Sequence, residues 1–379
     1  MGRPVIVEAV RTPIGRRGGA LAGLKAVELL RHVQVEVVRR AGVDPAAVEQ
    51  IIGGCVTQVG EQSLNVTRNA WLSTGLPPEV GCTTVDASCG SAQQANHLMA
   101  GLIAADAVGI GIACGVESMS RVPVGANIEA GPGHYLTPDY PYDDPPRMQF
   151  GGAERIARRQ GHTREQLDAY GLRSQQLAAR AWESGHFADE VTPVRGPEGT
   201  RVVRDEGLRH SAPEQLAALR PTLHGGLHTA ATTSQISDGA AAVLWMDEDR
   251  ARSLRLRPRA RLVHQVLTGA DPYYLLDGPV AATAQLLERA GMKLDGIDRY
   301  EVNEAFASVV LNWAEQHDAA LERTNPDGGA IALGHPLGAT GTRLLVTALH
   351  RLEATGGEHA LITMCCGGSL GTASLLRRI

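Results

Sequence analysis

Cys89 stands where the sequence predicts that a strand gives way to a helix. Gly90 and Ser91 follow it, and small residues continue through about Leu102. A helix N-terminus carries partial positive charge and free N–H groups, which favour the thiolate form of a cysteine. Small side chains also let a ligand approach the backbone. We therefore predict that Cys89 is a nucleophile, although most cysteines in proteins are inert buried thiols.

Three further residues have types that could complete such a site. His335 is a plausible base for Cys89, because Cys–His pairs recur in nucleophilic catalysis; its simpler role is a helix cap or a surface residue. Cys365 stands before the glycine pair 367–368, whose backbone N–H groups could face a developing oxyanion. Asn303 ends a predicted strand and could merely cap the next helix. All four fall at the C-terminal ends of predicted strands, where open α/β sheets bind ligands.

The segments around Cys89 and His335 follow one plan. In each, an apolar segment leads to a reactive residue that opens a helix, and a strand then ends in Cys and Gly. The two landmarks are 25 residues apart in the first copy (Cys89 to Cys114, 114 − 89) and 30 in the second (His335 to Cys365, 365 − 335). This pattern predicts one supersecondary unit used twice, with the reactive residues at equivalent loops of two halves.

Strand-like apolar runs alternate with helical stretches, which is typical of a mostly parallel sheet covered by helices. The expected strands are 5–7, 50–55, 107–113, 237–245, 259–266, 297–302 and 360–364, and the expected helices are 26–41, 65–72, 90–102, 280–290, 305–316 and 340–352.

The alternation stops near Ser118. Residues 121–148 are rich in Pro, Gly, Tyr and Asp, and they form a stretch too long for an ordinary connection. Thr163–Gln166 then has the pattern of a capping box at the start of a helix. We predict an α/β protein of two like halves with a helical and loop insertion in the first. The limits are 1–118 plus 231–256 for the N-terminal half, 119–230 for the insertion and 257–379 for the C-terminal half.

Composition excludes several other classes of protein. The 379 residues carry a net charge of −5 and no concentrated basic face, which argues against nucleic acid as a partner. The six cysteines show no metal-type spacing, so we expect free thiols and no metal. No apolar run approaches the ~20 residues of a spanning helix, and no secretory segment opens the chain. We therefore expect a cytoplasmic protein without a membrane segment.

Taken together, these residues resemble the thiolase superfamily, and thiolases rather than ketoacyl synthases, which lack the second catalytic cysteine. The resemblance runs from Glu8–Gly15 to the last strand. Its motifs are Cys89, Asn303-Glu304-Ala305-Phe306, Gly334-His335-Pro336 and Cys365-x-Gly-Gly. A narrower likeness to bacterial steroid 3-ketoacyl-CoA thiolases is carried by Gly53–Gln58, Gln93–Leu98, Ser234–Gly239 and Gln149-Phe150. The resemblance implies a five-layer α-β-α-β-α fold.

The resemblance also implies a mechanism and its residues. Cys89, deprotonated by His335, would attack a 3-ketoacyl-CoA, and Cys365 would be the acid and base for the acetyl-CoA enolate and for coenzyme A. His335 and a water on Asn303 would hold the enolate oxygen, and the backbone N–H groups of Cys89 and Gly367 the acyl oxygen. Coenzyme A is then a co-substrate, and no cofactor is needed.

For coenzyme A and substrate, the resemblance points to Ser234, Ala305, Phe306 and Arg209. Short-chain biosynthetic thiolases have His-Met where this chain has Gln149-Phe150, which suggests a bulky or branched acyl group bounded by the insertion. We also expect a homodimer or homotetramer, with the insertion contributing contacts. The alternatives are a general fatty-acid or acetoacetyl-CoA thiolase, an enzyme that runs toward condensation, and a non-catalytic scaffold that binds acyl-CoA.

Overall fold

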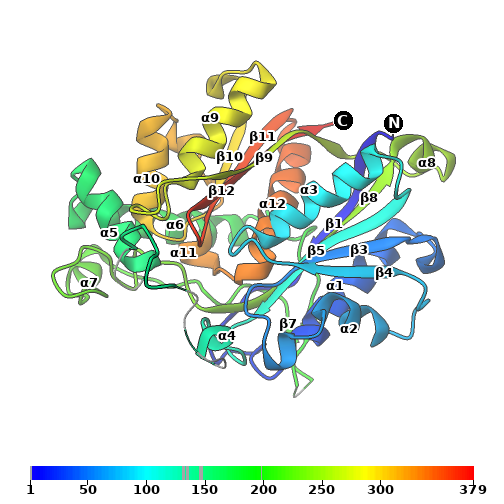
Figure 1. The fold of residues 1–379 in the computed structure, drawn as a ribbon, viewed down its shortest axis with the longest axis horizontal. Helices are drawn as coiled ribbons and strands as arrows, with labels where there is room; N and C mark the ends of the chain where they lie inside the picture. The colour runs from blue at the N-terminus through cyan, green and yellow to red at the C-terminus, as the bar shows by residue number, and fades with distance from the viewer. Residues whose placement is uncertain (1, 130–132, 134–135, 145–147, 198) are drawn as a thin grey trace.

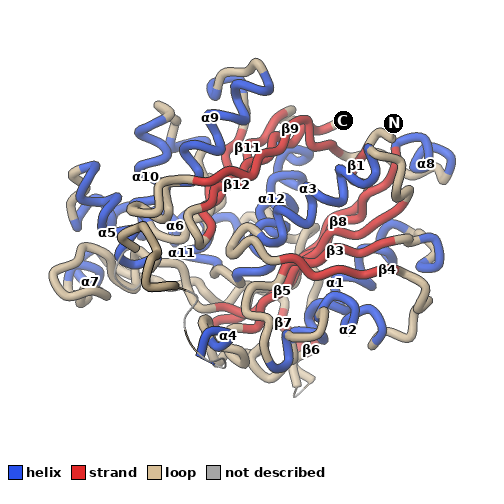
Figure 2. The backbone as a smooth tube through the Cα atoms, viewed as in Figure 1, coloured by secondary structure: helices blue, strands red, loops and turns tan. Residues whose placement is uncertain are grey.

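The computed structural model describes residues 2–129, 133, 136–144, 148–197 and 199–379 (Figures 1 and 2). Its strands are β1 (Pro4–Arg11), β2 (Gly15–Arg16), β3 (Gln50–Gly54), β4 (Gly81–Val85), β5 (Ile110–Ser118), β6 (Val194–Arg195), β7 (Arg201–Val202), β8 (Ser237–Asp247), β9 (Ala260–Gly269), β10 (Arg299–Val302), β11 (His359–Cys366) and β12 (Leu370–Arg378). Its α-helices are α1 (Ala26–Ala41), α2 (Val66–Leu72), α3 (Ser91–Ala104), α4 (Ala126–Glu129), α5 (Gln149–Gln160), α6 (Arg164–Glu183), α7 (Pro213–Ala217), α8 (Glu248–Ser253), α9 (Gly278–Ala290), α10 (Ala307–Gln316), α11 (Ala330–Leu333) and α12 (Thr340–Thr355).

The strand order shows the predicted duplication. The first half has the order β1-β8-β5-β3-β4 and the second has β9-β12-β11-β10. In both halves the first two pairings are antiparallel and the next is parallel. The two sheets join where β1 and β9 pair at Ile6 and Ala260. In the second half, whose residues 257–379 are all described, no strand stands in the place of β4, and the short helix α11 precedes His335 instead.

Three apolar clusters separate five layers, which confirms the expected fold. One cluster lies between the first sheet and helices α1 and α2, and another between the second sheet and helices α9 and α10. The cluster between them joins both sheets through α3 and α12, and Figure 1 shows these two helices between the sheets. Because side chains alternate along a strand, neighbouring residues of β11 serve different layers: Leu361 packs outward and Ile362 inward.

Several predicted elements are confirmed and two predictions are wrong. The helix expected at 26–41 is α1, and Thr163 caps α6 with the reciprocal bonds of a capping box. The strand expected at 107–113 is β5 at 110–118, because its small and polar end continues the ladder with β8, so Cys114 lies inside the strand. His335 was expected after a strand, but it follows α11. The limits of the halves and of the insertion stay predictions.

The insertion is anchored to the first strand by buried charges. The guanidinium of Arg11 donates to Glu190 Oε1 at 2.5 Å and to the two carboxylate oxygens of Asp205 at 2.7 and 3.1 Å. Helices α5, α6 and α7 lie together at one end of the molecule (Figure 1). Among the described residues, no helix is long and apolar enough to cross a membrane.

Candidate active site

A short turn places Cys89 between β4 and α3. The side chain of Asp86 accepts the N–H of Ser88 at 2.7 Å, and the Ser91 hydroxyl oxygen accepts the N–H of Ala87 at 2.9 Å. Ser88 has φ of +50°, a conformation that costs a non-glycine residue energy and is often found at functional sites. The turn therefore presents Cys89 just before the first residue of α3, as predicted.

Burial governs the protonation of Cys89. The side chain is 6% exposed, and loss of water raises its pKa to about 12. Hydrogen bonds from the backbone N–H groups of Gly367 and of Cys89 itself act in the opposite direction, while the charges of Glu117 and Asp86 raise the pKa further. The expectation that the helix N-terminus favours thiolate is thus outweighed by burial. The resting group is a thiol, and it needs a base to become a nucleophile.

Hydrogen bonds on both ring nitrogens orient His335. Its Nδ1 lies 2.6 Å from the Oγ1 atom of Thr340, whose hydroxyl donates to the carbonyl of Pro336 at 2.9 Å. Since that hydroxyl hydrogen is already used, we assign the ring hydrogen to Nδ1. Nε2 then carries a lone pair and accepts from Nδ2 of Asn303 at 3.3 Å. Burial, helped by the charge of Arg343, lowers the pKa of His335 to about 3, so the ring is neutral.

Cys365 completes the group at the end of β11. It is fully buried, and burial followed by the nearby sulfur of Cys89 raises its pKa well above the ordinary range. Its side chain packs with Ala305 and Phe306 in a small cluster that Phe150 joins. Cys89 thus lies with Cys365 and Gly367, and His335 lies with Asn303, whose N–H donates at 3.0 Å to the carbonyl of Thr363, two residues before Cys365.

The residues expected to bind substrate divide into two groups. Gln149 Nε2 lies 3.7 Å from the position that a Cβ on Gly367 would occupy, and Phe150 stacks edge-on against Phe306 with ring centroids 5.2 Å apart. The N–H of Ser234 donates to the carbonyl of Ala305 at 3.0 Å. Gln149 thus lies beside Gly367, and Phe150, Ala305 and Phe306 pack in the cluster that contains Cys365. Ser234 joins this group through its bond to Ala305.

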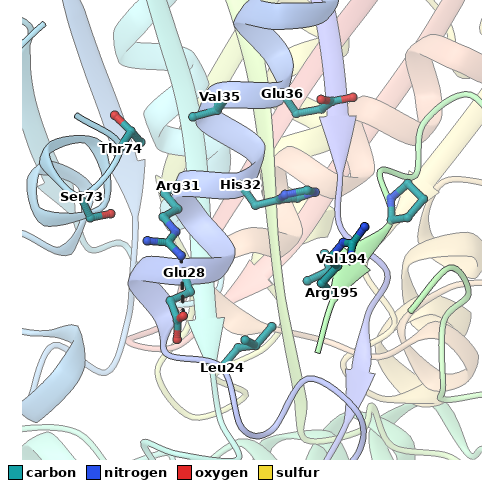
Figure 3. Close-up of a pocket in the computed structure, with 11 residues that line it drawn as sticks. Leu24, Glu28, Arg31, His32, Val35, Glu36, Ser73, Thr74, Val194 and Arg195 are labelled. Atoms are coloured by element: carbon teal, nitrogen blue, oxygen red, sulfur yellow. Dashed lines mark ion pairs between the residues drawn. The ribbon is translucent and has the colours of Figure 1, made fainter. Parts of the chain in front are cut away.

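Arg209 lies apart from this group. It is exposed, its backbone N–H donates to Gln175 Oε1 at 2.8 Å, and its guanidinium donates to the carbonyl of Ala230 at 3.2 Å. It lines a hollow of about 220 Å³ that α6 and Ala231 also border. Another hollow, of about 640 Å³, lies on α1 and β6 and contains no predicted site residue (Figure 3).

Sequence reasoning missed residues that support the site. Thr340 sets the tautomer of His335, and the carboxylate of Glu304 accepts from Tyr170 Oη at 2.9 Å, Ser174 Oγ at 2.6 Å and the N–H of Ile331 at 3.1 Å. Glu304 thereby ties α6 of the insertion to α11, just before His335. Its place beside Asn303 was visible in the sequence, but its partners were not.

Chemically, the site offers two thiols and one neutral base. The Nε2 lone pair of the buried His335 can remove one proton, and a second thiol can exchange another. Such a set suits transfer of an acyl group through a thioester.

Comparisons with known proteins agree with this geometry. The N-terminal domain of thiolases matches residues 4–249, and the C-terminal domain of thiolases matches residues 256–378. A steroid 3-ketoacyl-CoA thiolase of Mycobacterium tuberculosis is 42% identical over 100% of this chain and 95% of its own length. An acetyl-CoA acetyltransferase of Syntrophomonas wolfei is 38% identical over 99% of both chains.

Solved structures show the same likeness. The Bacillus anthracis acetyl-CoA acetyltransferase superimposes with a TM-score of 0.92 at 33% identity, covering 100% of this chain and 99% of that one. Human mitochondrial 3-ketoacyl-CoA thiolase in complex with CoA gives a TM-score of 0.92 at 31% identity, covering 100% and 98%. The chain therefore belongs to the thiolase family of acyltransferases.

Proposed function

We propose that the protein cleaves a 3-ketoacyl-CoA with coenzyme A, giving acetyl-CoA and an acyl-CoA shortened by two carbons. The observations that support this proposal are the closeness of Cys89 to Cys365 and the place of a neutral His335, whose Nε2 accepts from Asn303 at the end of β10, the strand that pairs with β11 of Cys365. Where the substrate carries a methyl branch at C2, the small product is propionyl-CoA.

In the first stage, His335 Nε2 takes the proton of Cys89, and the sulfur attacks the 3-keto carbon. The C2–C3 bond then breaks, its electrons pass to the enolate of acetyl-CoA, and the acyl group stays on Cys89 as a thioester. Cys365 gives its proton to C2 of the enolate and becomes a thiolate. Because burial disfavours this thiolate, it is a strong base for the next stage.

In the second stage, the thiolate of Cys365 takes the proton of the coenzyme A thiol. The new thiolate attacks the thioester on Cys89, and the shortened acyl-CoA leaves. Protonated His335 returns its proton to Cys89, which restores the starting state. No redox step occurs, so the proposal requires coenzyme A as co-substrate and no cofactor.

Two groups of donors would stabilise negative charge on the two reacting oxygens. The backbone N–H of Gly367 already faces the sulfur of Cys89, and with the N–H of Cys89 it would hold the acyl oxygen. The Oδ1 atom of Asn303 is buried without a hydrogen-bond partner in the described part of the chain. It is an acceptor suited to a water that would donate, together with His335, to the enolate oxygen.

An apolar wall beside Cys365 supports a bulky acyl group. Met148, Phe150 and Tyr274 pack against the cluster that contains Phe306 and Cys365. We propose a steroid side-chain or long, branched acyl substrate, in line with the name of the relative at 42% identity. A general fatty-acid or acetoacetyl-CoA thiolase is the alternative, since relatives with such names match over similar lengths.

For coenzyme A, we propose that the pantetheine lies along Ser234, Ala305 and Phe306. Arg209 would contact the phosphates or the adenine from the neighbouring hollow. The bond from Ser234 to Ala305 supports one continuous surface at this place. The role of Arg209 is proposed from the resemblance and from its exposed position.

We further propose a homo-oligomer, a dimer or a tetramer, in the cytoplasm. Strand β4 is an edge strand with exposed and half-buried residues, and edges left bare invite pairing with another chain. Beside it, Thr83 and Val85 border a hollow of about 440 Å³ with Leu98 of α3. A partner copy would cover this edge.

Replacing each cysteine in turn tests the two-thiol mechanism. Cys89→Ala should abolish cleavage of a 3-ketoacyl-CoA, and Cys365→Ala should lower kcat at least ~10³-fold, because the acid and base for C2 is lost. Cys114→Ala is the matched control, since Cys114 is a buried thiol inside β5 that packs against Gln34, and it should keep kcat within about twofold. The assay follows loss of the ketoacyl absorbance. Cleavage by Cys365→Ala at the rate of the unchanged protein would contradict the mechanism. No cleavage by the unchanged protein would favour the alternative of a non-catalytic scaffold that binds acyl-CoA.

Removing the hydroxyl of Thr340 tests the tautomer of His335. Thr340→Val should lower kcat by about tenfold, because Nδ1–H loses its acceptor and the ring can place its hydrogen on Nε2. Thr347→Val, a buried residue of the same helix, is the control and should keep the wild-type kcat.

The acid side of the pH profile tests the protonation of His335 in the same experiment. Because the pKa of His335 is lowered to about 3, its base form is lost only as pH falls through that value. In the wild type, kcat/KM should therefore show no decline near pH 6.5. A decline with a midpoint at ~6.5, the ordinary value for histidine, would contradict the assignment.

A panel of substrates tests the proposed acyl group. We expect kcat/KM to rise from acetoacetyl-CoA to long-chain and steroid side-chain 3-ketoacyl-CoA, by at least ~10-fold, since the pocket buries more apolar surface of the larger chains. The same panel with Phe150→Met, the short-chain family's residue, should show a smaller preference. Equal or better turnover of acetoacetyl-CoA by the wild type would point to the short-chain alternative.

A further inference from the structure

Glu117 lies buried near Cys89, and its hydrogen-bond partners in the described part of the chain are all N–H donors. Its Oε1 accepts from the N–H of Thr57 at 3.1 Å and from Nε2 of Gln62 at 2.7 Å. Its Oε2 accepts from the N–H of Val56 at 3.0 Å and of Gly338 at 2.9 Å. Burial raises the pKa of Glu117, and the four N–H donors act in the opposite direction. Because its hydrogen-bond partners in the described part of the chain are all donors, which leaves no partner for a carboxyl hydrogen, we assign a carboxylate. It is fully buried, and amides take the place of water.

One of these four bonds crosses from one half of the molecule to the other. Glu117 is in β5 of the first half, whereas Gly338 is in the loop of the second half that follows His335, 221 residues away. Gly338 stands three residues after His335 and two before Thr340. The bond therefore holds the segment between the catalytic ring and the hydroxyl that fixes its tautomer.

The same loop packs against the backbone of Gly54, Cys55 and Gly115 in the first half, which together form a socket for it. A Cβ on Gly115 would lie 2.0 Å from the carbonyl oxygen of Gly338, and one on Gly54 would lie 2.7 Å from it. A Cβ on Gly338 would lie 2.7 Å from Cα of Cys55. Contacts this close leave no room for a side chain, so the loop rests directly on β3 and β5.

The socket also touches the helix of the nucleophile. The Cβ position of Gly54 is 2.4 Å from the backbone nitrogen of Ala92, in the first turn of α3. Thus the helix that begins just after Cys89 and the loop that follows His335 meet at one glycine. A shift of the loop out of the socket would change the distance between the two catalytic residues.

We propose that Glu117 is a positioning residue for the reaction: its carboxylate locks the loop after His335 into the first half and so sets where His335 stands relative to Cys89. Glu117 touches neither substrate nor reacting atoms. The inference rests on the proposed function, because it concerns the His335–Cys89 pair that begins the reaction.

The charge of Glu117 gives the test a second measurable quantity, which is the ionisation of Cys89. It raises the pKa of Cys89, and the other carboxylate that does so is Asp86, in the loop between β4 and α3. The thiols of Cys365 and Cys366 also lie close to Cys89, and the thiol of Cys55 faces Glu117 and Asp86. Removing the charge without disturbing the fold should therefore make Cys89 easier to ionise, although turnover falls.

Two variants of Glu117 separate position from charge. Glu117→Gln keeps the shape but loses acceptors and charge, and Glu117→Asp keeps the charge but is one carbon too short to hold all four donors. Both should lower kcat for 3-ketoacyl-CoA cleavage at least ~10-fold, as expected for a small misplacement of a catalytic group, with KM for coenzyme A within about twofold. Asp298→Asn is the control, since Asp298 also accepts two backbone N–H groups, from Glu358 and His359, outside the site. It should keep wild-type kcat.

Alkylation of Cys89 by iodoacetamide over a range of pH, measured by peptide mass spectrometry, completes the test. We expect its midpoint to fall in Glu117→Gln and to stay at the wild-type value in Glu117→Asp. A kcat within about twofold of wild type in Glu117→Gln would overturn the proposal. So would equal midpoints in the two variants, which would indicate a general loosening of the fold. No cleavage by the wild type would instead overturn the proposed function, and the alkylation midpoints would still be measurable.

Discussion

The hydrogen bond between His335 Nδ1 and Thr340 Oγ1 decides what the site can do. At 2.6 Å, and with the threonine hydroxyl already donating to Pro336, it leaves the lone pair of the ring on Nε2. Burial then keeps the ring neutral, while the same loss of water keeps Cys89 as a thiol. The resting groups are therefore both neutral, and in the proposed mechanism a proton moves only when the sulfur of Cys89 approaches the 3-keto carbon of the substrate.

Duplication explains how such a pair is assembled from distant parts of the chain. The two halves share the same order over four strands, but the first contains Cys89 and the second contains His335, Asn303 and Cys365. Cys114, the counterpart of Cys365, lies inside β5 and packs against Gln34, with no part in the site. The middle layer of α3 and α12 brings the two halves together. Their alignment then depends on contacts between the halves, of which the Glu117 carboxylate is one.

Much of this could be predicted from local sequence. The small residues Gly90 and Ser91 after Cys89 indicated the start of a helix, and α3 begins at Ser91. The apolar spacing of residues 26–41 predicted α1 with its observed bounds. The strand at 107–113 was misplaced because Gly115, Glu117 and Ser118 look like a strand end, yet β8 pairs with each of them. The helix before His335 was missed because four apolar residues fit a strand or a helix equally well. Glu117 gave no signal, since its key partner is 221 residues away.

Mass spectrometry of the protein mixed with a 3-ketoacyl-CoA in the absence of free coenzyme A tests the central claim most directly. The account predicts that one equivalent of acetyl-CoA is released while the shortened acyl group appears on the peptide that contains Cys89, and that adding coenzyme A removes it. Release of acetyl-CoA with no acylated protein would contradict the account. So would a shortened acyl group on Cys365 in place of Cys89.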